Sequence, residues 1–73
     1  MSEKKKIAKE ILILKEEIQQ LEIKRSRSQS ALLLALVSKE QPDPEDVKFF
    51  TAFSSEIDFK REQMKKLIAS IEE

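Results

Sequence analysis

The chain contains no cysteine, histidine, tryptophan, tyrosine or glycine. Without cysteine there is no disulfide and no thiolate, and without histidine the commonest general base and zinc ligand is missing. A phosphate-binding loop built on glycine is excluded as well. The remaining reactive groups are carboxylates and lysines, and no pattern gathers them into a pocket. We therefore expect a protein that is not an enzyme and that has no catalytic residues, no cofactor and no metal site.

The length and charge of the chain indicate one small domain. Its 73 residues are in the range where a single hydrophobic core is marginal without a partner. Residues 1–39 hold nine Lys/Arg and five Asp/Glu, a net charge of +4, and residues 40–73 hold five and nine, a net charge of −4. The longest apolar run, Ala31–Val37, has seven residues, whereas about 20 are needed to span a bilayer. With no visible secretion signal, we expect a cytoplasmic protein that does not contact a membrane.

The strongest pattern in the sequence is a pair of heptad repeats of apolar residues, separated by a short segment that contains two prolines. Apolar residues alternate at spacings of four and three in each half, which places them on one narrow stripe of a helix. Two such stripes joined by a turn predict an all-α fold, an antiparallel two-helix hairpin in which position i lies opposite about 83 − i. The predicted hairpin seam consists of Ile11, Leu14, Ile18, Leu21, Leu32, Phe50, Phe53, Ile57, Met64, Leu67 and Ile71.

The helix boundaries follow from proline and from capping residues. We expect one helical hairpin over residues 1–73, with helix one over about 3–39, a turn over 40–43 and helix two over 44–71. Asp43 is suited to cap the second helix, and Pro44 is suited to its first position. The polar stretch Lys24–Ser30 preserves the phase of the first seam, which favours one continuous helix with a polar layer. Its basic residues could instead contact phosphate, but the lack of a basic stripe elsewhere and of interleaved tyrosine or tryptophan argues against nucleic-acid binding.

The seam does not account for all of the apolar surface. The segment Ala31–Val37 is apolar on every side, which is typical of a helix buried all round, and a hairpin alone cannot cover it. We expect this surplus to contact another protein chain, and self-association into a four-helix bundle is the alternative. The predicted partner-binding residues are Leu33, Leu34, Leu36, Val37, Phe49 and Phe59.

The chain resembles the small co-chaperones of type III secretion needle subunits. The similarity runs from Ala31 to Leu67: a leucine- and alanine-rich end of the first helix, a short turn, the segment Pro44–Phe50, and a second helix carrying Ile57 and Leu67. The resemblance implies a helical hairpin bound by a tetratricopeptide-like second chaperone, the two together holding an unpolymerised needle subunit in the cytoplasm. The chain departs from that pattern in having no glycine in the turn and no tyrosine early in the second helix.

The sequence thus favours a non-catalytic protein-binding module, a small cytoplasmic chaperone or co-chaperone that shields an apolar helix of a secretion-system component. Its expected partners are a helical co-chaperone, a secreted subunit, or both, with homo-oligomers possible and no nucleic acid. Three alternatives stay open: a homodimeric four-helix-bundle regulator, a coiled-coil scaffold segment, and a needle-like secretion subunit, which residues 31–60 also resemble.

Overall fold

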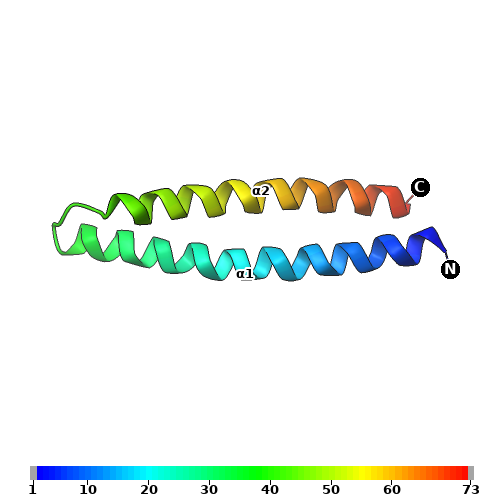
Figure 1. The fold of residues 1–73 in the computed structure, drawn as a ribbon, viewed down its shortest axis with the longest axis horizontal. Helices are drawn as coiled ribbons and strands as arrows, with labels where there is room; N and C mark the ends of the chain where they lie inside the picture. Colours follow the sequence, from blue (N-terminus) through cyan, green and yellow to red (C-terminus); the bar gives the residue numbers. More distant parts are fainter. Residues whose placement is uncertain (1, 73) are drawn as a thin grey trace.

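The computed structural model describes residues 2–72 and consists of two long helices packed side by side (Figure 1). Helix α1 spans Glu3–Val37 and helix α2 spans Pro44–Glu72. They run antiparallel and form a rod with extents of 56 × 16 × 14 Å, with both chain ends at the end opposite the turn. The prediction of an all-α helical hairpin is confirmed.

Helix α1 is continuous through its polar stretch. Ser2 caps its N-terminus, where the Ser2 hydroxyl accepts a hydrogen bond from the Lys5 backbone N–H at 3.3 Å. Ser28 points into the seam and is buried, with 9% of its surface exposed. Its hydroxyl donates to the Lys24 carbonyl oxygen at 3.4 Å, one turn earlier in the helix. The serine therefore satisfies its own polar group inside the helix, and the stretch 24–30 does not interrupt the helix.

Helix α1 ends at Val37, two residues before the predicted boundary at about residue 39. Lys39 adopts a left-handed conformation with a φ of 56°. The Lys39 N–H donates to the Leu36 carbonyl at 3.2 Å, and the Glu40 N–H donates to the Ala35 carbonyl at 2.9 Å. This pair of bonds is the Schellman arrangement, which terminates a helix and usually places glycine where Lys39 stands. The turn therefore covers residues 38–43, longer than the expected 40–43.

Helix α2 begins at Pro44, directly after a capping aspartate. The Asp43 carboxylate accepts a hydrogen bond from the Glu45 N–H at 2.9 Å, and the Asp43 carbonyl accepts from Asp46 and Val47. Proline fits the first position because its missing N–H would have no partner there. At the other end the helix continues to Glu72, one residue beyond the expected limit.

The hydrophobic core is a narrow strip between the helices. Ile57 is fully buried, and Ile18 and Leu21 pack around it from α1. Phe53 and Met64 extend this cluster along α2. The other members of the seam are half-buried because a single partner helix covers only one side of each. These half-buried seam residues are Ile11, Leu14, Leu32, Phe50, Phe53, Met64, Leu67 and Ile71.

Two ion pairs join the helices at the level of the core. Lys60 is the polar member of the α2 stripe, and its Nζ lies 3.5 Å from a Glu17 oxygen. The Arg61 guanidinium donates to Glu22 at 3.0 Å. Both bridge α1 and α2 beside the Ile57 cluster and help to hold the two helices in register.

Neither helix, within residues 2–72, has a stretch both long and apolar enough to cross a bilayer.

Candidate protein-binding surface

The end of the rod near the turn carries a concentrated group of exposed apolar side chains. Val37 is 81% exposed, Leu34 is 66% exposed, and even the partly covered Phe49 is 48% exposed. We call this group the loop-end patch. It consists of Leu33, Leu34, Leu36, Val37, Val47 and Phe49.

The turn brings the two helical parts of the patch together. The Schellman turn at Lys39 and the cap at Asp43 reverse the chain within six residues, so the last turns of α1 lie beside the first turns of α2. Phe49 is held by a second aromatic side chain, since its ring stacks on Phe53 with centroids 6.1 Å apart and an interplanar angle of 18°. Phe53 belongs to the seam, so this stack connects the patch to the interior.

The predicted partner-binding residues lie at two separate places on the rod. Five of the six predicted partner-binding residues lie in the loop-end patch, but Phe59 does not. It lies ten residues after Phe49, about 15 Å farther along α2. Phe59 shares an open hollow with Ile13 and the seam residues Leu14 and Leu67. Phe59 therefore belongs to a second exposed apolar site, in the half of the rod nearer the chain ends.

Val47 was not among the predicted partner-binding residues, although it is exposed in the patch. The apolar pattern places Val47 off the main stripe of α2, as it does Phe49 and Phe59, so the sequence does indicate its exposure. The signal that identifies it is positional, because residue 47 lies opposite Leu36 when facing positions add to 83. Ile13 is likewise off the stripe of α1 and outside the predicted partner-binding set, although it is exposed beside Phe59.

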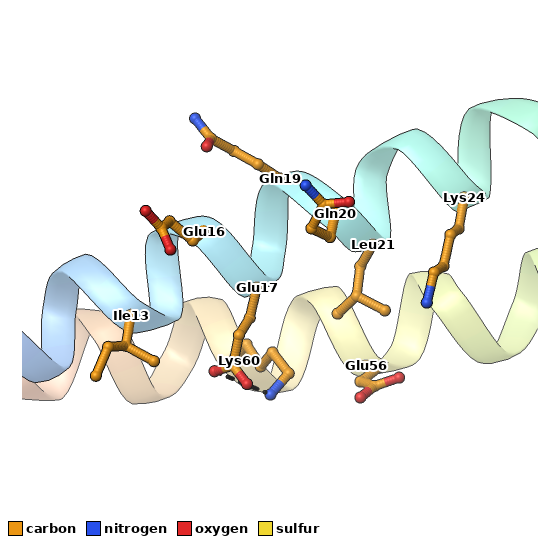
Figure 2. A pocket seen from close by; sticks show the side chains of 9 residues that line it. All are labelled: Ile13, Glu16, Glu17, Gln19, Gln20, Leu21, Lys24, Glu56 and Lys60. Atoms are coloured by element: carbon orange, nitrogen blue, oxygen red, sulfur yellow. Dashed lines mark ion pairs between the residues drawn. The ribbon is translucent and has the colours of Figure 1, made fainter.

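The middle of the rod has a different, polar surface. A shallow hollow there is bordered by Glu17, Lys24, Glu56 and Lys60, with apolar groups supplied by Ile13 and Leu21. Figure 2 shows these side chains coming from both helices, with the ion pair between Glu17 and Lys60 drawn as a dashed line. Acidic and basic groups alternate around the hollow, so no charge of one sign accumulates for a charged ligand.

The chemistry that this arrangement supports is packing against another apolar surface. Within residues 2–72, no three His, Cys, Asp or Glu side chains come together in a way that could hold a metal ion. Every buried side-chain oxygen or nitrogen in that range has a hydrogen-bond partner, so no polar group points into the interior awaiting a ligand. An exposed apolar patch of several adjoining residues is typical of a protein-interaction site.

Comparison of the chain with protein-family models gives no match, and comparisons with curated proteins and with solved structures give none either.

Proposed function

We propose that the chain is a non-catalytic protein-binding module whose loop-end patch covers an apolar helix of another protein. The single observation that supports this most strongly is the exposure of six adjoining apolar side chains of α1 and α2 at one end of the rod. Burying an apolar side chain of this size contributes about 1.5–3 kcal/mol, so a partner that covers the patch gains several kcal/mol.

The more specific form of the proposal is a small cytoplasmic chaperone or co-chaperone of a secretion system. It rests on the resemblance of residues 31–67 to the co-chaperones of type III secretion needle subunits. The resemblance implies an unpolymerised needle subunit as the client, and in this proposal the chain shields an apolar helix of that client. A rod with an apolar patch at one end suits that task, because the patch can dock on the client or on a tetratricopeptide-like second chaperone while the middle of the rod stays folded.

The proposal is tested by recovering partners from the native host with the tagged full chain. We expect a helical chaperone or a secreted subunit to co-purify, as identified by mass spectrometry. Replacing Leu33 and Leu34 with lysine should abolish this recovery while circular dichroism shows an unchanged helix content. The control is Ile23→Lys, which places one lysine on an exposed apolar position of α1 outside the patch.

Two results would contradict the proposal. The first is recovery of the same partners by the Leu33→Lys, Leu34→Lys double variant. The second is a loss of partners in the Ile23→Lys control that is as complete as in the double variant, because a general loss of solubility or folding would then explain both.

A further inference from the structure

The hairpin exposes more surface than a compact chain of its size. It exposes 5912 Å², whereas a compact single chain of this mass exposes about 4,700 Å². The difference between these two areas is more than 1,000 Å². It arises because two helices form only one layer, whereas stable domains pack two layers together. A stable interface covers about 800 Å² on each partner. The excess is therefore large enough for a second layer of equal size.

One face of the rod is suited to carry that layer. Residues that immediately precede a seam residue line the hollows along the rod, and they come from both α1 and α2. These positions of the two helices therefore lie on the same face of the rod. This face, which we call the Phe49 face, carries both exposed phenylalanines, Phe49 and Phe59, together with Leu34. Aromatic side chains contribute most strongly to interfaces.

We propose that, in the absence of its partner, the chain pairs with a second copy of itself through the Phe49 face, with the two turns at the same end of the dimer. In this arrangement the two-fold axis runs along the rod, and α1 of each copy lies over α2 of the other. The product is a four-helix bundle with antiparallel neighbours. The inference rests on the proposed function in one respect: the second copy covers part of the loop-end patch until a partner protein takes its place.

Facing residues in this arrangement are complementary. Residues at the same height on the two helices have numbers that add to about 80–83, as for Lys24 and Glu56, which border one hollow, and Glu22 and Arg61, which form an ion pair. Phe49 of one copy then lies between Ala31 and Leu34 of the other.

The same register also pairs opposite charges across the interface. Glu56 of one copy lies between Lys24 and Arg27 of the other, and Lys66 lies beside Glu17. Each of these contacts occurs twice because of the two-fold axis. Opposite charges at fixed positions set the register of the two copies and disfavour others.

The other two-fold arrangement, with the turns at opposite ends, lacks this complementarity. It stacks α1 on α1, and the midpoint of α1 is near residue 20, so Leu34 would lie over Lys6 and Arg27 over Ile13. Residue 20 lies at the height of residues 60–63 of α2, so Phe49 would lie over the last residues of α2 or beyond them. Helix α1 has eight Lys/Arg and five Asp/Glu, a net charge of +3, so the stack would also bring like charges together. Both the apolar and the charged positions therefore favour the arrangement with the turns together.

The absence of cysteine makes the arrangement directly measurable. Sedimentation equilibrium of the full chain should give twice the chain mass. Gln41→Cys should form a covalent dimer with a short bis-maleimide. An equimolar mixture of Gln41→Cys and Ala69→Cys chains, labelled with a probe pair of short transfer range, should show little energy transfer, because Ala69 lies outside the Phe49 face and about 37 Å along α2 from its start at the turn. A monomer at about 100 micromolar would overturn the inference, and so would strong transfer between residues 41 and 69.

Variants then test the face and the register. Leu34→Lys should raise the dimer dissociation constant about a hundredfold, and Val37→Lys, which is outside the Phe49 face, should leave it within about threefold. The Lys24→Glu, Arg27→Glu double variant should raise it more than about tenfold, and adding Glu56→Arg should restore it because both charge pairs are then reversed. Equal effects of Leu34→Lys and Val37→Lys, or no rescue by Glu56→Arg, would overturn the assignment of this face.

The outcome is separable from the proposed function. If the chain is a monomer and still recovers a partner that the Leu33→Lys, Leu34→Lys variant loses, the self-pairing is wrong and the binding function stands. If the chain dimerises as described and recovers nothing from its host, the self-pairing stands and the binding function fails.

Discussion

The middle of the rod and its loop end are built from similar residues and behave differently. In the middle, Ile18, Leu21 and Ile57 close around one another, and two interhelix ion pairs lie beside them. At the loop end the helices are just as regular, yet none of the large apolar residues is buried, and the six residues of the loop-end patch are exposed. The middle therefore holds the hairpin together, and the loop end offers surface that another chain can cover.

The difference teaches how a small chain separates stability from binding. A two-helix layer buries one stripe only, so apolar residues added outside that stripe do not strengthen the fold. They stay available for contact with a partner. Six of the eleven exposed large apolar residues in the described range lie near the turn, where two local devices, the Schellman turn and the aspartate cap, hold the backbone without help from a core.

The largest effect should come from the core of the middle segment. Ile57→Ala removes a fully buried side chain and should lower the free energy of unfolding by about 2–5 kcal/mol, enough to unfold much of the isolated chain. Urea unfolding followed by circular dichroism measures this change. Ile23→Ala makes the same chemical change at a half-exposed site and should lower the free energy of unfolding by less than about 1 kcal/mol. Similar losses in both variants would break the comparison.

The cap of α2 should be the next most important feature at the loop end. Asp43→Ala removes the acceptor of the Glu45 N–H and should lower the free energy of unfolding by about 1 kcal/mol. Asp43→Ser keeps a side-chain oxygen at the cap and should retain most of the stability. Thermal unfolding of the three proteins distinguishes them. A serine variant as unstable as the alanine variant would show that the cap is not what matters at this position.

The left-handed residue offers a stabilising change at the loop end. Lys39→Gly removes the steric cost of a positive φ and should raise the free energy of unfolding by about 0.5–1 kcal/mol. Lys39→Ala removes the same charge without relieving the backbone, so it should give no gain. The midpoints of urea unfolding measure both. A gain of equal size in the two variants would attribute the effect to charge instead of conformation.

The smallest effect concerns the ion pairs of the middle segment. Glu22 and Arg61 are both partly exposed, so their coupling should be about 0.5 kcal/mol in a double-mutant cycle with Glu22→Gln and Arg61→Gln. The coupling should fall toward zero in about 1 M salt, where charges are screened over a few Å. A coupling that is undiminished by salt would mean that the pair packs the helices together instead of acting through charge.

The parts of the fold that could be predicted are those that a local pattern determines. The 4-3 spacing defines a stripe regardless of the partner, and Ile18, Leu21 and Ile57 all lie on it. The pair Asp43–Pro44 carries its own capping chemistry, so the start of α2 could be placed to the residue. Ser28 continues the phase of the stripe, which is why a polar stretch did not hide the continuity of α1.

The parts that could not be predicted depend on geometry without a local signature. Helix α1 ends two residues early because Lys39 is left-handed, and lysine gives no warning of that conformation, unlike glycine or asparagine. Phe59 was grouped with Phe49 because both lie off the apolar stripe of α2, although about 15 Å along the helix separates them. The identity of the partner cannot be inferred from the patch, since apolar contact is not directional and many helices fit it.

The position of both chain ends at one end of the rod has a practical consequence. A surface, a dye or a fused domain attached at either end is separated from the turn by nearly the whole 56 Å length of the molecule. Such an attachment leaves the turn and the exposed apolar residues beside it at the free end of the rod, where they stay accessible to another protein.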